Sequence, residues 1–136
     1  MISLQVGVKA FLKNKDGKYL IVHRSSDKYG KTSGSWDIVG GRIEPGTSLL
    51  ENLKREIKEE VNLDIISEPL LIQAQDIIPS EDRHIVRLTY TSLSDGELIL
   101  DKNEHDDYKW LTLDEIKELP DLDIYVKDIL TNNLVS

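Results

Sequence analysis

Three glutamates on one predicted helix are the most chemically informative group in this sequence. Glu56, Glu59 and Glu60 lie within the run Arg55-Glu56-Ile57-Lys58-Glu59-Glu60. Successive residues of a helix turn by roughly 100°, so the three carboxylates fall within about a third of the helix circumference. Carboxylates this close repel one another unless a cation binds or their pKa values rise. Oxygen-only ligands at this spacing favour a hard cation, Mg²⁺ or Mn²⁺.

A glycine pair, Gly40-Gly41, comes shortly before this helix. Glycine lets the backbone approach a ligand closely and can turn a carbonyl oxygen toward a metal ion. The other interpretation is a solvated helix face on which Lys54, Arg55 and Lys58 pair with neighbouring glutamates. The metal site is favoured because the carboxylates border the apolar stripe of the helix and because the glycine pair precedes them.

The helix that carries the carboxylates is predicted to begin after Ser48. Ser48 and Glu51 have the spacing of a capping box. Asn62 stands where the helix should end, and asparagine tolerates the left-handed conformation needed there. The apolar residues that follow helical spacing are Leu49, Leu50, Leu53, Ile57 and Val61.

The rest of the chain predicts strands interleaved with a few helices. Alternation and turn residues predict strands at 6–12, 18–23, 64–78, 84–93 and 108–111, and further helices from Thr112 and Asp121. Residues 36–39 are a short apolar segment that ends at the glycine pair. We find no internal repeat and no linker, so residues 1–136 are expected to form one domain. Its predicted class is α/β or α+β, a mixed sheet packed by helices. On position alone, residues 25–35 and 73–83 are predicted to be recognition loops.

Composition excludes several classes of function. The 136 residues are 39% hydrophobic and 31% charged, as in a soluble globular domain. Cysteine is absent, which excludes disulfides and thiolate metal sites. The net charge of −8 argues against a nucleic-acid or membrane surface, and no signal peptide is recognisable, so a cytoplasmic protein is expected. A polyanionic small molecule stays possible because a divalent cation can reverse the local charge.

The run from Gly41 to Leu63 resembles the Nudix box, the signature of MutT-like Nudix hydrolases. The matching residues are Gly41, Arg55, Glu56, Ile57, Glu59, Glu60 and Leu63. Flanking matches extend the likeness to most of the chain. The resemblance implies a Nudix-type α/β/α sandwich with a mixed β-sheet flanked by helices. Two box positions depart from the pattern, since Thr47 replaces a usual glutamate and Asn62 replaces a usual glycine.

The resemblance also implies roles for individual residues. Glu56, Glu59 and Glu60 would be metal ligands together with the carbonyl oxygen of Gly40. Glu56, or a carboxylate outside the box, would take a proton from the attacking water. Arg55 would orient the glutamates.

Two residues outside the box match positions that have roles in some members of the family. Glu104 matches a loop position that often supplies a fourth carboxylate, and Arg24 matches one that contacts substrate phosphate. Each has a plainer alternative, a solvated loop residue for Glu104 and an exposed charge for Arg24. The scattered histidines His23, His84 and His105 are expected in core or surface roles.

The implied function is Mg²⁺-dependent hydrolysis of a diphosphate bond, with Mn²⁺ as a possible substitute. The simplest substrate is a small-molecule nucleotide, a nucleoside triphosphate cut to monophosphate and pyrophosphate. The alternative is an attenuated or non-catalytic Nudix-like module that binds a nucleotide or sugar-phosphate as a sensor. Thr47 is the residue that supports this alternative. The sequence does not distinguish a monomer from a homodimer.

Overall fold

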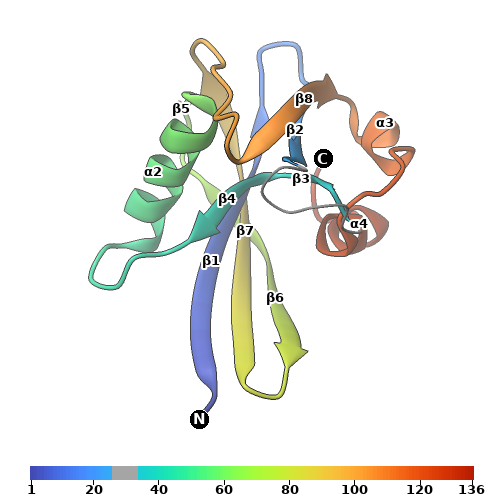
Figure 1. Cartoon of the computed structure of the whole chain (residues 1–136). Coiled ribbons are helices and arrows are strands. Elements are labelled where there is room, and N and C mark those ends of the chain that lie inside the picture. The colour runs from blue at the N-terminus through green and yellow to red at the C-terminus, as the bar shows by residue number, and fades with distance from the viewer. Residues whose placement is uncertain (26–33) are drawn as a thin grey trace.

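A mixed β-sheet runs through the centre of the protein, and of the helices in the described part of the chain, α2 (Leu49–Val61) lies on one side and α3 (Leu113–Lys117) and α4 (Ile124–Thr131) on the other (Figure 1). The structure is a computed structural model that describes residues 1–25 and 34–136. The strands are β1 (Ser3–Lys13), β2 (Tyr19–Arg24), β3 (Trp36–Asp37), β4 (Val39–Arg42), β5 (Asp64–Ile65), β6 (Leu70–Ser80), β7 (Arg83–Asp95) and β8 (His105–Leu111).

The pairing of β1 with β7 forms the centre of the sheet. These two strands run parallel in continuous register from Ser3 opposite Arg83 to Lys13 opposite Leu93. Every other pairing is antiparallel: β2 and β4 pair with β1, β3 and β8 with β2, and β5 and β6 with β7. The mixed sheet flanked by helices confirms the predicted fold class.

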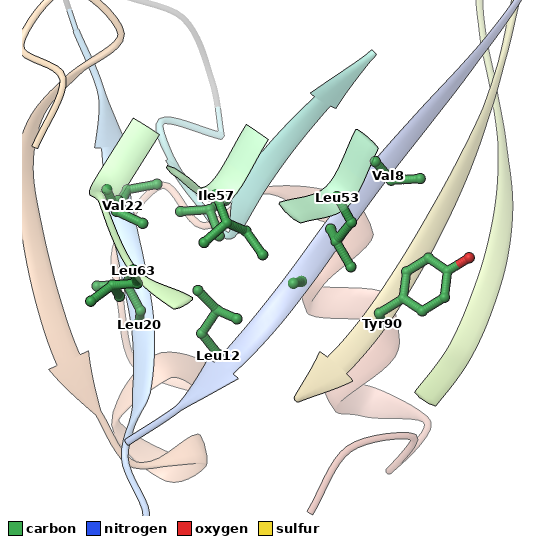
Figure 2. Packing of buried hydrophobic residues seen from close by; sticks show 11 residues of the cluster. Val8, Leu12, Leu20, Val22, Leu53, Ile57, Leu63 and Tyr90 are labelled. Atoms are coloured by element: carbon green, nitrogen blue, oxygen red, sulfur yellow. The ribbon is translucent and has the colours of Figure 1, made fainter. Parts of the chain in front are cut away.

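Two apolar clusters, one on each side of the sheet, hold the layers together. Alternate residues of a strand point to opposite faces, so β1 contributes to both clusters. Figure 2 shows the cluster beneath α2, in which Leu53 and Ile57 pack over Val8 and Leu12 of β1. Phe11 of the same strand faces the other cluster, which is completed by α3 and α4. The core therefore fixes the position of α2 relative to β1.

Helix α2 is capped by the two residues that the sequence predicts, Ser48 and Asn62. The Ser48 hydroxyl accepts a hydrogen bond from the Glu51 amide at 3.1 Å. Among the described residues, the Glu51 carboxylate makes no return bond, so only half of the predicted capping box forms. Asn62 has φ 62° and ends the helix in the left-handed conformation, as predicted. Leu53, Ile57 and Val61 are fully buried, whereas Leu49 is exposed.

Two sequence-based expectations are wrong in detail. The strand predicted at 64–78 is two strands, because residues 66–69 leave the sheet between β5 and β6. Most of the recognition loop predicted at 73–83 belongs to β6, and only Glu81 and Asp82 turn toward β7. The other predicted loop, 25–35, lies largely outside the described residues. Where the structure describes the chain, none of its helices combines the length and apolar character needed to span a membrane.

Candidate active site

An open pocket of about 460 Å³ lies where β4 meets α2. One wall is formed by the glycine pair on β4, and the carboxylates of α2 form the wall that faces it. Its lining residues are Gly40, Gly41, Arg42, Glu56, Glu59, Glu60, Asp101 and Glu104. We call this hollow the carboxylate pocket. It brings together all three predicted helix glutamates, Gly40 and Glu104.

The glycine pair makes room for the backbone and for a carboxylate. Gly40 has φ +138°, and a side chain there would collide with the carbonyl oxygen of Val8 on β1. A Cβ at Gly41 would stand only 2.6 Å from Oε2 of Glu56. Glycine at both positions therefore lets β4 lie against β1 and lets Glu56 lie against β4.

Glu60 is the most tightly held of the pocket's carboxylates. It is 6% exposed, and its Oε2 accepts a hydrogen bond from the Gly40 amide at 2.8 Å. Its Oε1 lies 2.9 Å from Nε2 of His105, which is also buried. When Glu60 is ionised it can only accept, and the donor of this bond is then Nε2 of His105. Nδ1 of His105 is buried and has no hydrogen-bond partner among the described residues.

Arg55 lies behind the pocket and contacts two of its glutamates. One guanidinium nitrogen donates to Glu56 Oε1 at 3.0 Å and to Glu59 Oε2 at 3.3 Å. The other donates to Asn52 Oδ1 at 2.9 Å. The contact with Glu59 joins residues one helical turn apart. Asn52, which sequence reasoning missed, holds the guanidinium from its far side.

Burial raises the pKa of the Glu56 carboxyl above its ordinary value, and the nearby charge of Glu60 acts in the same direction. Arg55 opposes both effects. Desolvation and like charge are the two causes expected where carboxylates are gathered at a buried helix face.

A family profile described as NUDIX domain matches residues 3–131, which is nearly the whole chain. The chain belongs to the NUDIX domain family. It is a Nudix hydrolase, and enzymes of this family generally use a divalent metal ion.

Relatives and solved structures agree with this membership. The chain is 28% identical over 124 residues to the nucleoside triphosphatase NudI of Salmonella paratyphi B, covering 85% of this chain and 86% of that protein. Its fold resembles that of the MutT protein of Methanosarcina mazei, with TM-score 0.81, 22% identity, and coverage of 96% of this chain and 93% of that one. A MutT NUDIX hydrolase of Burkholderia pseudomallei matches with TM-score 0.79 and 24% identity over 98% of this chain and 99% of that one.

The departure from the Nudix box at Thr47 lies outside the carboxylate pocket. Thr47 is exposed, and its side chain makes no hydrogen bond within the part of the chain that the structure describes. Its carbonyl oxygen accepts a bond from Nδ2 of Asn52 at 3.0 Å. Asn52 also accepts from the Glu44 amide at 2.9 Å and so holds the turn that leads into α2. The box thus lacks one carboxylate beside the pocket, while the pocket keeps its own five.

Glu104 and Asp101 bring two of those five carboxylates from the loop before β8. Glu104 is partly buried and lines the pocket, so it is not simply a solvated loop residue. The Asp101 amide donates to the carbonyl oxygen of Glu60 at 2.8 Å, which ties this loop to the end of α2. It was not predicted from the sequence that Asp101 lines the pocket. Its position three residues before Glu104, in the same loop, is the sequence feature that could have indicated it.

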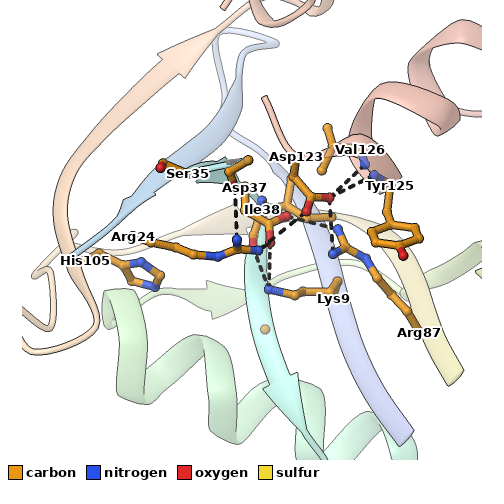
Figure 3. A network of polar contacts seen from close by, with 12 residues as sticks. Lys9, Arg24, Ser35, Asp37, Ile38, Arg87, His105, Asp123, Tyr125 and Val126 are labelled. Carbon is orange, nitrogen blue, oxygen red and sulfur yellow. Dashed lines mark hydrogen bonds and ion pairs between the residues drawn. The ribbon is translucent and has the colours of Figure 1, made fainter. Parts of the chain in front are cut away.

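Arg24 lies outside the carboxylate pocket, in a neighbouring buried charge network (Figure 3). One of its nitrogens lies 2.7 Å from Asp37 Oδ2, and another donates to the Gly34 carbonyl at 3.0 Å. Its side chain is 28% exposed. Arg24 is therefore not a freely exposed charge, and it does not line the carboxylate pocket.

The donors of the carboxylate pocket fit a hard cation, but they are not preassembled. Among residues 1–25 and 34–136, no group of three or more Asp, Glu, His or Cys side chains is arranged to hold a metal ion. Glu56 and Glu59 are turned toward Arg55, and Glu60 toward Gly40 and His105. Apart from Arg42, the described residues of the lining offer carboxylate and main-chain oxygens, which suit Mg²⁺ or Mn²⁺. Arg55 bonds Oε1 of Glu56 and Oε2 of Glu59, so among the described contacts the second oxygen of each carboxylate is left for a cation.

Proposed function

We propose that this Nudix hydrolase cuts a nucleoside triphosphate to monophosphate and pyrophosphate, with Mg²⁺ as its metal and Mn²⁺ as a possible substitute. The observation that supports it most directly is the carboxylate pocket, in which five carboxylates face one hollow beside a glycine turn. The likeness to nucleoside triphosphatases named NudI supports the substrate class.

We assign the residue roles from this geometry. Glu56, Glu59, Glu60 and the carbonyl oxygen of Gly40 would hold the metal. A divalent cation held there would supply charge to offset that developing on the phosphates and would lower the pKa of a water molecule. Glu60 is fixed by its two hydrogen bonds and serves as the rigid ligand.

The remaining residues act around those ligands. Glu56 or Glu104 takes the proton of the attacking water. Arg55 orients Glu56 and Glu59 from behind, through the two bonds described above. Arg24 is assigned to a substrate phosphate, from the neighbouring network.

The test is a panel of nucleoside triphosphates, nucleotide sugars and dinucleoside polyphosphates incubated with purified protein and Mg²⁺. Release of pyrophosphate and nucleoside monophosphate from a triphosphate is expected. A folded protein that turns over none of these compounds would contradict the proposal. Cleavage of nucleotide sugars alone would contradict its substrate class.

The variant Glu60→Gln is expected to lower kcat on the order of 100-fold or more, because a neutral amide cannot hold the cation that stabilises the transition state. The matched control is Glu51→Gln, which removes an exposed carboxylate of the same helix away from the pocket. Equal kcat values for the two variants would remove Glu60 from the mechanism.

A further inference from the structure

A second and larger hollow, of about 740 Å³, adjoins the carboxylate pocket and has the opposite charge. The two share Gly41 and Arg42 on β4, so they meet at the glycine turn. We call the second hollow the cationic cleft. Its lining residues are Gly7, Lys9, Arg24, Gly41, Arg42, Ile77, Pro79, Arg83, Ile85 and Arg87. Five of these carry positive charge and none is acidic.

Three of the five cationic side chains are partly neutralised by two buried carboxylates, those of Asp37 and Asp123. Lys9, Arg24 and Arg87 each lie within 3.3 Å of a carboxylate oxygen of Asp37. Arg87 also lies 3.3 Å from Asp123 Oδ2 (Figure 3). Both carboxylates are buried, at 1% and 5% exposure, so they balance charge beneath the cleft without lining it.

The other two cationic side chains, Arg42 and Arg83, form no ion pair with a carboxylate of the described residues. Arg42 is exposed at the end of β4, and Arg83 is partly buried at the start of β7. The described residues give the cleft five basic side chains, and two carboxylates are paired with them. This leaves an excess of three positive charges, in a chain whose net charge is −8. Such an excess on one concave surface favours an anionic ligand.

The uncharged residues that line the cleft indicate which chemical group of a ligand it can bind. Ile77, Pro79 and Ile85 are its apolar side chains, and no aromatic residue lines the cleft in the part of the chain that the structure describes. A nucleobase is commonly held by stacking on an aromatic ring, and the described residues of this wall include none. Arginine side chains, in contrast, match phosphate oxygens in geometry and charge.

We propose that the cationic cleft binds an anionic group of the substrate beyond the two phosphates that flank the scissile bond, with Arg42 and Arg83 as its specificity-determining residues. The inference rests on the proposed hydrolase function. In a nucleoside triphosphate cut to monophosphate and pyrophosphate, that group is the terminal phosphate. The cleft would then select triphosphates over compounds such as nucleotide sugars, in which an uncharged sugar follows the second phosphate.

Binding of inorganic tripolyphosphate to the full chain in the presence of EDTA isolates the cleft, because without a divalent cation the carboxylate pocket repels anions. Calorimetry should detect binding to the wild type. Arg83→Gln and Arg42→Gln should each weaken it about tenfold, the scale of one charge-assisted hydrogen bond. Lys117→Gln, which removes an exposed charge on α3, is the matched control and should bind as the wild type does.

Absence of tripolyphosphate binding would overturn the proposal, and so would an equal loss in Lys117→Gln and Arg83→Gln. Thermal melting shows whether each variant is folded. Kinetics supply a second arm, in which Arg83→Gln should raise KM about tenfold for a nucleoside triphosphate and leave KM for a nucleotide sugar unchanged.

The two proposals fail in distinguishable ways. A protein that hydrolyses nothing but binds tripolyphosphate through Arg42 and Arg83 would refute the hydrolase function and keep the cleft. A protein that hydrolyses triphosphates with the same KM in wild type and Arg83→Gln would refute the cleft alone.

Discussion

The carboxylate of Glu60 is oriented from two directions, by a backbone amide of β4 and by the ring of His105 on β8. Both bonds are short and buried, so they hold the Glu60 carboxylate in this orientation. Within residues 1–25 and 34–136, the carboxylates of Glu56 and Glu59 are bonded to the partly exposed Arg55 alone. At the scale of the residue, the site therefore combines one fixed carboxylate with two that can move.

His105 acts through Glu60, and we expect it to be a positioning residue. His105→Leu removes the donor to Oε1 and should lower Mn²⁺ affinity about tenfold, as loss of a bond to a metal ligand commonly does. His105→Gln places an amide N–H near the position of Nε2 and should restore most of that affinity. The measurement is Mn²⁺ titration followed by electron paramagnetic resonance, with thermal melting alongside. If the two variants bind Mn²⁺ equally, His105 has only a packing role.

The sequence revealed the acidic residues of the site but not all the partners that hold them. Glu56, Glu59 and Glu60 were identified because their helical spacing is local. His105 lies 45 residues from Glu60, and nothing in a single sequence encodes that its ring turns toward it. The bonds from Asn52 to Arg55 and Glu44 were missed for a different reason, because a buried asparagine on a helix leaves no periodic pattern.

At the scale of the element, α2 presents its carboxylates correctly only if it ends at the right residue. Glu60 and Val61 are in its last turn, and both are buried against the sheet. The turn is closed by the amide of Asn62, which donates to the Lys58 carbonyl at 3.1 Å. Nδ2 of Asn62 also donates to the Glu97 carbonyl at 3.0 Å and so fastens the helix end to the loop after β7.

Asn62→Ala should lower the free energy of unfolding by about 1–2 kcal/mol, because alanine resists the left-handed conformation. Asn62→Gly should cost less, since glycine accepts φ 62° and only the bond to Glu97 is lost. Urea unfolding of the three proteins measures both differences. An alanine variant as stable as the glycine variant would contradict the conformational argument.

The elements themselves were largely predictable. The hairpin of β1 and β2, the caps of α2, and β7 follow local patterns of alternation and turn residues. The pairing of β1 with β7 was not predictable, since it joins segments about eighty residues apart. The assignment of 73–83 to a loop was wrong because β6 is an edge strand whose side chains are mostly exposed, so its composition is that of a surface segment.

At the scale of the whole molecule, Asp37 joins elements from distant parts of the chain. It lies on β3 and contacts Lys9 of β1, Arg24 of β2 and Arg87 of β7. Arg87 also pairs with Asp123, whose carboxylate caps the start of α4. Burial alone would raise the pKa of Asp37, but the charges of Arg87, Lys9 and Arg24 together hold it well below its ordinary value.

Asp37→Asn should lower the free energy of unfolding at pH 7 by about 3–5 kcal/mol, because it leaves buried cations without their partner. A carboxyl with a lowered pKa stabilises the fold above its unfolded pKa, and that contribution is lost as pH falls toward the folded pKa. The difference from wild type should therefore shrink as pH falls below about 3.9, the ordinary pKa of aspartate.

Denaturant unfolding at several pH values measures this dependence. Asp123→Asn is the control, since burial and the charge of Asp37 raise the pKa of Asp123, and asparagine also caps helices well. It should cost less than Asp37→Asn at neutral pH. A difference between wild type and Asp37→Asn that stays constant down to pH 3 would contradict the assignment.

The parallel pairing of β1 with β7 also determines when the site can exist during synthesis of the chain. The first strand to leave the ribosome must wait for residues 83–93 before its central neighbour is available. Helix α2 is local and can form earlier, so its glutamates are present before the surfaces that organise them. Arg83 and Arg87 arrive with β7, and His105 arrives later still. A nascent chain that stops before residue 105 would thus contain the entire Nudix box and still lack the partner that fixes Glu60.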